Sequence, residues 1–485
     1  MLQDDSLKNL SEQRQFEHKT NGGKMADLIQ EALKTSTDTK AIAFGRGVIN
    51  ETGRIFKELF GDAKGIIIAD GNTWEVAGEQ VKASLEEAGV ELFEPFIFPG
   101  TPTLYAGYEN VERVRDHVKD MDVRCVSIGG GTLNDLVKLA NGELGRPYMN
   151  VCTAASMDGY AAFGASITRD GFKITRNCPA PAGLIGDLDI MAHAPHRLTA
   201  TGVGDLIEKV PAGADWIISD ILGIEAIHEQ SWNLVQPPLR EALSDPEGIK
   251  ASDPDALHGL AQELILSGLA MQSMQSSRPA SGAGHNFSHQ WEMEGHGLDW
   301  EPPLSHGQKV GIGTVASCAL YDALASIDID AIDPQEVAAK QLSPEDNKKR
   351  VEDLQPIKAI RDAAVDQSMQ KYVPADKLPE RVQLIKDNWS RILEESKKQV
   401  MPAKEIADIL KRCGAPYHPA QLDVDMEKMK LTYYQSQTIR ARYNITDVLY
   451  DLGIYSDVVE SLFAPGGYWA EAEVPTEGFI NPAKQ

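Results

Sequence analysis

The sequence lacks any long uninterrupted run of apolar residues. Short runs such as "GIIIA", residues 65–69, are typical of the chain, whereas a membrane-spanning helix needs about 20 consecutive apolar residues. Residues 1–24 are polar and mixed in charge and contain no apolar core, so they do not resemble a secretory signal. We therefore expect neither a membrane span nor a secretory signal peptide.

Cysteine and positive charge are both scarce. The 485 residues include five cysteines, an odd number, with no CxxC pair. This pattern favours a reducing cytoplasm over a disulfide framework or a thiolate zinc site. Lys and Arg number 47 against 72 Asp and Glu, for a formal net charge of −25. Such an excess repels nucleic acids and anionic membranes, so we expect a small-molecule partner, with homo-oligomerisation left open.

The length predicts two or more hydrophobic cores. From Ala41, apolar strands alternate with amphipathic helices: "AIAFG", "GIIIAD", "VELFEPFIF", "DVRCVSI" and "YMNV" are the expected strands. Continuous apolar strands in such an alternation predict a Rossmann-like parallel sheet covered on both faces, and the runs around Asp170-Gly171 predict a β-hairpin. The fold class is thus an α/β domain followed by an all-α domain. The expected parts are a polar N-terminal extension (1–40), a nucleotide-binding α/β domain (41–195), a helical metal- and substrate-binding domain (196–463) and an extended tail (464–485).

The stretch "SIGGGTLNDLVKLAN" joins a strand to a helix through three glycines, Gly129, Gly130 and Gly131. Thr132 would be the N-cap, with Asp135 completing a capping box, and the helix N-terminus could receive a phosphate. It is neither GxGxxG nor a P-loop, so a plain tight turn is the alternative. Asp70, at the end of "GIIIAD", could accept a hydrogen bond from a ribose 2′-OH, although such an aspartate alone is more often a cap. Together the two features favour a dinucleotide, and NAD over NADP.

Histidines form the second candidate site. "HNFSH" places His285 and His289 four residues apart, on one face if the segment is helical; "SHGQKVGIGT" adds His306, and "TGVGDLIEK" adds Asp205, at what looks like the start of a helix. Such groups suit a divalent metal, but for the pair alone a structural role is equally plausible. His296, between two glycines, looks like a solvent-facing helix end and is left out.

Five motifs in order, "GGGTLNDLVK", "TAASMDGYAA", "GDLIEK", "SSRPASGAGHNFSH" and "HGQKVGIGT", resemble the sn-glycerol-1-phosphate dehydrogenases. That family belongs to the superfamily of iron-containing alcohol dehydrogenases, glycerol dehydrogenases and dehydroquinate synthases. The resemblance runs from about Ala41 to Tyr455, where "QSQTIRARYNITDVLYDLG" is similar to the end of the longer bacterial members.

The resemblance implies NAD(P)H-dependent, metal-dependent interconversion of dihydroxyacetone phosphate and sn-glycerol 1-phosphate, for phospholipid biosynthesis. It implies Asp205, His285 and His306 as ligands of nickel or zinc, and His289, Asp158 and Asp205 as substrate-contacting residues. The cofactor, NAD(H) with NADP(H) as the second option, would contact Asp70, Gly129, Gly130, Gly131, Thr132, Leu133, Asn134, Asp135, Thr153, Ala154, Ala155 and Ser156.

Two positions depart from the family. Ala162 stands where a serine usually contacts the nicotinamide side, and Ser166 could replace it. Gly284 stands where an acidic residue usually precedes the metal-binding histidine, which could loosen the groups around the metal. For the substrate phosphate we consider Arg278, Lys209 and Arg440, with surface ion pairing as the alternative role of each.

Three other functions remain open at this point. A polyol dehydrogenase acting on unphosphorylated glycerol would use the same metal ligands. A synthase of the dehydroquinate type would carry a glutamate where this chain has Asp205. A non-enzymatic helical protein would have structural histidines, and it leaves the ordered motifs unexplained.

Overall fold

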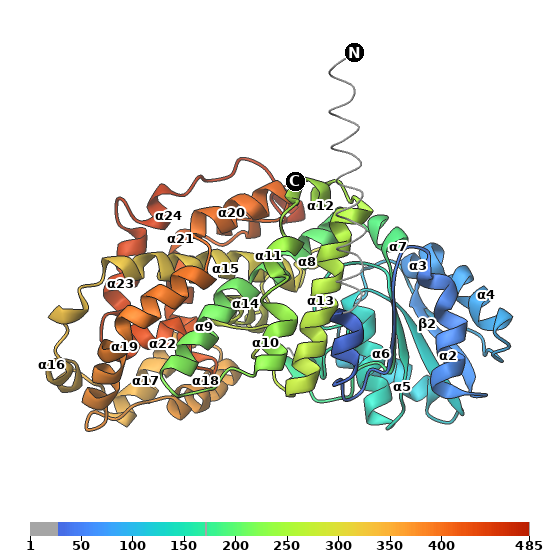
Figure 1. The fold of residues 1–485 in the computed structure, drawn as a ribbon, viewed down its shortest axis with the longest axis horizontal. Coiled ribbons are helices and arrows are strands. Elements are labelled where there is room, and N and C mark those ends of the chain that lie inside the picture. Colours follow the sequence, from blue (N-terminus) through green and yellow to red (C-terminus); the bar gives the residue numbers. More distant parts are fainter. Residues whose placement is uncertain (1–27, 170–171, 485) are drawn as a thin grey trace, which may run out of the picture.

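The computed structural model describes residues 28–169 and 172–484, and its two halves differ in secondary structure (Figure 1). Strands alternate with helices as far as Asp187, and beyond it the described residues form helices and loops. The predicted N-terminal extension lies outside the described residues up to residue 27. In its described part, Ile29 and Ala32 are buried in the core of the helical half.

Six parallel strands form one sheet in the order β1-β8-β5-β4-β2-β3, and an antiparallel hairpin of β6 and β7 stands apart from it. The predicted parallel sheet and hairpin are therefore confirmed; the hairpin tip, Asp170-Gly171, lies outside the described residues. The strands are β1 (Ala41–Gly45), β2 (Lys64–Asp70), β3 (Phe96–Phe98), β4 (Val123–Gly129), β5 (Met149–Cys152), β6 (Ala165–Arg169), β7 (Phe172–Arg176) and β8 (Gly183–Asp187).

Helices cover both faces of the sheet because successive strand side chains point to opposite faces. Ile66 and Ile68 of β2 are buried in one cluster with side chains of α5 and α6. Ile67 and Ala69 are buried in another, with side chains of α2 and α4. The helices of this half are α2 (Thr52–Phe60), α3 (Gly71–Thr73), α4 (Glu79–Glu87), α5 (Tyr108–Val118), α6 (Gly131–Glu143) and α7 (Leu188–Ala192).

Two strands differ from expectation. β8, "GLIGD", was not predicted, yet it lies inside the sheet between β1 and β5. Its glycines hide the usual strand signal, and they make room for neighbouring side chains, since a Cβ on Gly183 would lie 2.6 Å from Leu59 Cδ1 and displace it. The strand expected at residues 90–98 is limited to Phe96–Phe98, with an isolated bridge between Leu92 and Gly65. Pro95, which has no N–H to donate, precedes this short edge strand.

The second half packs its helices around one large core that also takes in Cys152 and Leu184 from the sheet. α13 stands between the sheet and the other helices (Figure 1). The tail expected to be extended includes one short helix, α24, with buried Trp469, and most of its other described residues are irregular. None of the described helices combines the length and the hydropathy of a membrane span. The helices are α8 (His196–Ile207), α9 (Lys209–Ile221), α10 (Glu229–Val235), α11 (Leu239–Ala242), α12 (Pro246–Lys250), α13 (Pro254–Met274), α14 (Ala283–Met293), α15 (His306–Ala323), α16 (Pro334–Ala339), α17 (Pro344–Leu354), α18 (Lys358–Gln370), α19 (Leu378–Gln399), α20 (Ala403–Arg412), α21 (Met426–Thr438), α22 (Ile445–Asp451), α23 (Tyr455–Phe463) and α24 (Tyr468–Glu471).

Candidate active site

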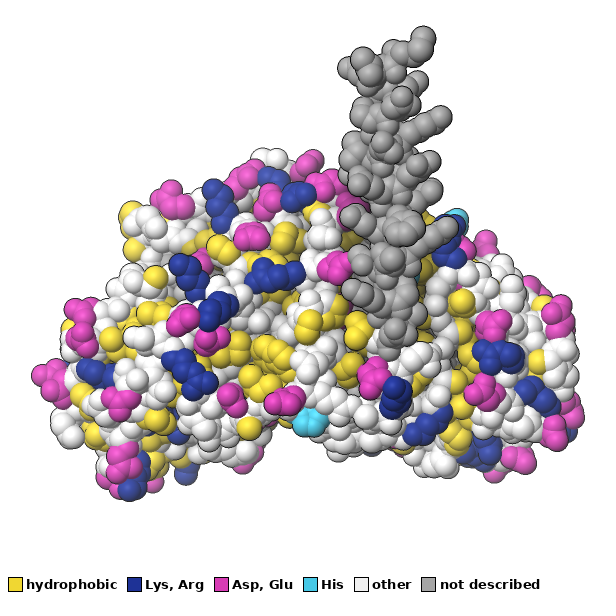
Figure 2. Space-filling view, in the orientation of Figure 1, with side chains coloured by type: hydrophobic (Ala, Val, Ile, Leu, Met, Phe, Trp, Pro, Cys, Tyr) yellow, Lys and Arg dark blue, Asp and Glu magenta, His cyan; other side chains and the backbone are white. Residues whose placement is uncertain are grey.

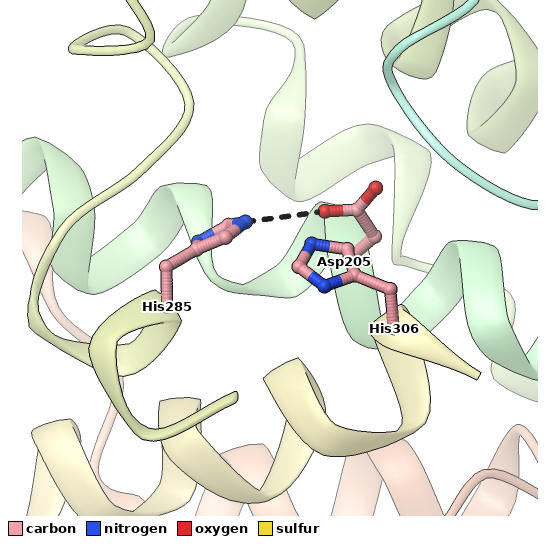
Figure 3. Close-up of side chains that lie close together, drawn as sticks. All are labelled: Asp205, His285 and His306. Atoms are coloured by element: carbon pink, nitrogen blue, oxygen red, sulfur yellow. Dashed lines mark ion pairs between the residues drawn. The ribbon is translucent and has the colours of Figure 1, made fainter. Parts of the chain in front are cut away.

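Three helices bring the predicted metal ligands together (Figure 3). Asp205 lies in the last turn of α8, not at the start of a helix as expected, while His285 is in the first turn of α14 and His306 begins α15. One potential ligand atom from each lies within 4.8 Å of the others, and His285 Nε2 is 3.5 Å from Asp205 Oδ1. Two imidazoles and one carboxylate are donors that suit a divalent first-row metal. That these residues bind one stays a prediction.

A glycine adjoins each of the three ligands and lets the helices approach closely. A Cβ on Gly204 would lie 2.1 Å from the carbonyl oxygen of Gly307, and one on Gly307 would lie 1.9 Å from that of Thr201. A Cβ on Gly284 would lie 2.9 Å from Glu208 Cγ. At Gly204 and Gly307 a Cβ would overlap backbone atoms, so these two positions exclude any larger residue, whereas at Gly284 the side chain of Glu208 would have to shift. The glycines in "GDLIEK", "GAGHNFSH" and "HGQK" therefore help to set the spacing of the cluster.

Two buried glutamates that we did not predict lie behind the histidines. Glu208 Oε2 is 2.8 Å from His285 Nδ1, and its Oε1 accepts from the backbone N–H groups of Gly282 and His285 at 3.0 and 3.3 Å. Glu292 lies 2.9 Å from His306 Nδ1 and 3.3 Å from His289 Nδ1. A carboxylate next to Nδ1 orients the imidazole and leaves Nε2 as the nitrogen that can bind a metal.

Glu208, in the turn between α8 and α9, supplies a carboxylate beside His285 although residue 284 is a glycine; the loosening expected from Gly284 stays a prediction. Sequence spacing contained a signal for both glutamates. Glu208 follows Asp205 by three residues, and Glu292 follows His289 by three. In a helix that spacing places side chains on one face.

Lys209 neutralises the carboxylates of the cluster. Its fully buried ammonium lies 2.7 Å from Asp158 Oδ2 and 3.1 Å from Asp205 Oδ1. Burial alone would lower the pKa of Lys209, but these two carboxylates outweigh it and raise the pKa. Burial would likewise raise the pKa of Asp205, yet Lys209 and the histidines hold it below its usual value. Asp205 is thus kept ionised, as a metal ligand must be.

His285 and His289 differ in charge near neutral pH. Burial alone would lower the pKa of His285, but Glu208 and Asp205 raise it to about 9, so a metal ion must displace a proton there. Burial, assisted by the positive charge of Arg440, lowers the pKa of His289 well below its usual value. His289 is therefore neutral near pH 7, and its ring centroid lies 5.8 Å from that of His285.

The predicted cofactor residues meet at one edge of the sheet. The strands are parallel, and Ala69 pairs with Ile128 while Gly129 pairs with Cys152, so Asp70, Gly130 and Thr153 follow on adjacent strands. The chain passes outward from β2 to β3 but in the opposite direction from β4 to β5. The strand order therefore reverses between β2 and β4, where α/β sheets bind their ligands.

The glycine-rich turn starts its helix differently from our expectation. Gly130, not Thr132, is the N-cap of α6, and it makes no side-chain capping bond. Asp135 instead accepts from the backbone N–H of Ser166 at 3.0 Å and lies 3.4 Å from Lys138 Nζ. The first turn is consequently without a side-chain cap, a suitable place for an anion.

Three cofactor candidates also have structural contacts. The side chains of Leu133 and Asn134 are buried, and Asn134 Oδ1 accepts from Tyr148 OH at 2.8 Å, so only their backbone could face a ligand. Asp70 accepts from Thr73 N at 2.9 Å and caps α3. Its carboxylate has a second oxygen for a ribose, and that role stays a prediction.

One loop connects the nucleotide edge to the histidine cluster. It starts at Thr153, whose N–H donates to Gly129 O at 3.3 Å. Ala154, Ala155 and Ser156 follow, all buried, and Tyr160 OH donates to Ala154 O at 2.7 Å. At its far end the Asp158 N–H donates to Asp205 Oδ2 at 3.0 Å. Ser156, the last expected cofactor residue, is therefore two positions before Asp158, whose N–H contacts the expected metal ligand Asp205.

The remaining candidate residues differ in burial and in the hydrogen bonds that they already make. Ala162 is buried beside Met271, and the backbone N–H of Ser166 donates to Asp135. His296, expected to face solvent, is partly buried and contacts the carbonyl oxygen of Leu422 at 2.7 Å. Arg278 is buried and donates to Asp215 O and Ser219 Oγ. None of Arg278, Lys209 and Arg440 is a surface ion-pairing residue, and Arg440 makes the fewest contacts.

Comparisons with known proteins identify relatives of this chain. The family model described as iron-containing alcohol dehydrogenase matches residues 43–195. A protein of Halalkalibacterium halodurans named as a glycerol-1-phosphate dehydrogenase using NAD(P)+ is 35% identical over 286 residues, covering 58% of this chain and 70% of that one. A protein of Pyrococcus furiosus with the same name is 33% identical over 283 residues, 58% and 78% of the two chains.

Solved structures share the fold. A probable glycerol dehydrogenase from Sinorhizobium meliloti superposes with a TM-score of 0.54 at 15% identity over 88% of this chain and 99% of its own. The glycerol dehydrogenase of Schizosaccharomyces pombe gives 0.54 at 14% identity over 92% and 98%. At such identities the likeness concerns the fold alone, and it confirms the predicted architecture of an α/β domain followed by a helical one.

Proposed function

Because this chain belongs to the glycerol-1-phosphate dehydrogenases, within the iron-containing alcohol dehydrogenases, we propose that it reversibly reduces dihydroxyacetone phosphate to sn-glycerol 1-phosphate with NAD(P)H. The observation that carries the proposal is the loop from Thr153 to Asp158. It begins at the switch-point edge and ends on Asp205. A cofactor at that edge and a metal at the cluster would thus lie at the two ends of one short segment.

The residues of the cluster fit a resident divalent metal, with nickel or zinc as our proposal. Such an ion on Asp205, His285 and His306 would supply Lewis-acid polarisation of the ketone, and the nicotinamide would supply the hydride. Glu208 and Glu292 hold the imidazoles with Nε2 toward the site. Lys209 holds the carboxylates of Asp158 and Asp205 in place through its ammonium group.

His289 is proposed to contact the substrate and not the metal. Its Nδ1 faces Glu292 Oε2, so the proton is assigned to Nδ1 and Nε2 is left to accept a hydrogen bond. Because the imidazole is neutral, Nε2 can take a proton from a substrate hydroxyl or return it. Asp158, bonded to Lys209 and to Ser267 Oγ, is proposed to position a second hydroxyl.

The cofactor is proposed to extend from Asp70, at its adenosine ribose, across the first turn of α6 to Thr153–Ser156. NAD is the favoured form, since Asp70 would repel a 2′-phosphate. We also propose a cytoplasmic location, consistent with five free and buried cysteines. The division into a nucleotide-binding part at 41–195 and a metal-binding part at 196–463, and homo-oligomerisation, stay predictions.

NADH oxidation by the metal-reconstituted full-length chain tests this function. Dihydroxyacetone phosphate should be reduced with a much higher kcat/KM than dihydroxyacetone, and glyceraldehyde 3-phosphate should be a poor substrate. Equal or better turnover of dihydroxyacetone would instead identify a polyol dehydrogenase on the same scaffold. Chiral analysis of the product should give the sn-1 phosphate, and the opposite enantiomer would contradict the proposal.

A further inference from the structure

Two arginines of the segment between α21 and α22 turn toward the loop that leads into α14. Arg440 Nη1 donates to Ser281 Oγ at 3.1 Å. Arg442 donates to Ser281 O at 2.8 Å and to Ser277 Oγ at 3.0 Å. All these acceptors are neutral. Within the described part of the chain, no carboxylate oxygen forms an ion pair with either guanidinium at 4.0 Å or less.

Neither arginine has a carboxylate oxygen of the described residues within 4.0 Å, although the chain is rich in acidic side chains. Acidic side chains are plentiful, with 72 against 47 basic ones, and they are spread over the face shown in Figure 2. The nearby buried Arg278 does have one, since its Nε lies 3.3 Å from Glu225. Burial and the like charges of Arg440 and Arg278 lower the pKa of Arg442 to about 9. A desolvated cation beside other cations is costly unless an anion joins it.

The position of the pair relates it to the active site. Ser281, which both arginines contact, lies four residues before His285 in the segment entering α14. Arg440 is also close enough for its charge to act on Glu292 and Glu208, the carboxylates behind the histidines. Both arginines are partly buried, so a small ligand can still reach them.

We propose that Arg440 and Arg442 bind the phosphate group of the substrate and thereby select phosphorylated over unphosphorylated trioses. The inference rests on the proposed function. A guanidinium has five N–H groups and pairs with phosphate through parallel hydrogen bonds. Most of these groups remain available, because Arg440 uses one and Arg442 two in the contacts above. The glycine-rich turn is left for the cofactor, so the two anionic ligands have separate sites.

The test compares two substrates in single-residue variants of the metal-loaded full-length enzyme. Arg440→Gln and Arg442→Gln should each lower kcat/KM for dihydroxyacetone phosphate by roughly 10- to 100-fold, mostly through KM, since each removes a charged hydrogen-bond donor. Turnover of dihydroxyacetone, which has no phosphate for the arginines to bind, should fall far less than that of dihydroxyacetone phosphate. Arg350→Gln is the matched control, because Arg350 is also partly buried and donates to the neutral acceptors Asn347 Oδ1 and Gln437 Oε1. An equal loss for both substrates would overturn the assignment.

A binding measurement separates this inference from structural damage. Inorganic phosphate should stabilise the wild-type chain against heat without metal or NADH, but not the Arg440→Gln/Arg442→Gln double variant. Arg442→Lys keeps the charge and should recover part of the preference. Equal stabilisation of wild type and double variant would refute the arginine site without contradicting the proposed function. If the wild-type enzyme does not prefer the phosphorylated substrate, the proposed function itself is wrong.

Discussion

Glu208 allows a quantitative test of how the metal cluster is built. It is fully buried and makes three contacts, with His285 Nδ1, His285 N and Gly282 N. In Glu208→Gln the amide oxygen can still accept the two backbone hydrogen bonds, whereas the negative charge beside the His285 imidazole is lost. The variant therefore removes the electrostatic support of one ligand while retaining the N-terminal contacts of α14.

The expected size follows from that single contact. Carboxylates behind metal-binding histidines contribute about 10- to 100-fold in metal affinity, which corresponds to about 1.4–2.7 kcal/mol. Without the charge the pKa of His285 should also fall from about 9. Metal binding at neutral pH would then release fewer protons, because less of the imidazole is protonated beforehand.

Titration of the metal-free protein with nickel or zinc against a chelator of known affinity measures the first effect. Calorimetry in two buffers of different ionisation enthalpy measures the second. Glu263→Gln is the matched control: Glu263 is also a buried glutamate, and burial raises its pKa well above the usual value, so the amide replaces a neutral acid. Equal affinities of Glu208→Gln and wild type above about pH 9, where the metal displaces little or no proton from His285 in either protein, would show that Glu208 does not support the ligand.

Three further predictions follow from the site and its surroundings. His285→Ala should lose bound metal and activity together, whereas His289→Ala should keep metal and lose catalysis; metal analysis beside kcat decides, and loss of metal from His289→Ala would reverse the two roles. Asp70→Asn should weaken NADH binding severalfold with an unchanged Tm, because asparagine also caps a helix; an unchanged Kd by fluorescence titration would remove Asp70 from the site. Burial and the neighbouring Asp447 raise the pKa of Asp451 to about 7, against the opposing effect of Arg381, so its protonated form stabilises the fold below the unfolded pKa, and this contribution is lost as pH rises through about 7. The destabilisation by Asp451→Asn, measured by denaturant unfolding, should therefore be larger at about pH 5.5 than at about pH 8.5, and the reverse order would contradict it.

The sequence by itself determined the elements and the chemistry. Alternating apolar runs predicted the parallel strands because each strand must bury both faces. β2 fits this rule, with Ile66 and Ile67 in opposite cores. The four-residue spacing of "HNFSH" predicted that His285 and His289 share a helix, since spacing within a helix is a local property. Local patterns did not reveal β8, because its glycines make room for side chains from other parts of the chain.

Only the tertiary structure decided what each side chain does. Glu208 approaches His285 because glycines let α8, α14 and α15 come within backbone contact, and no pattern within one helix encodes that approach. Thr132 looked like a cap, yet the backbone starts α6 at Gly131 and leaves its first turn without a side-chain cap. Arg440 and Arg442 resemble any other arginines in the sequence; only the structure shows that they both contact Ser281 and that no carboxylate oxygen of the described residues forms an ion pair with them. Contacts between segments far apart in the chain fix burial and charge balance, and these determine the role of an ionisable group.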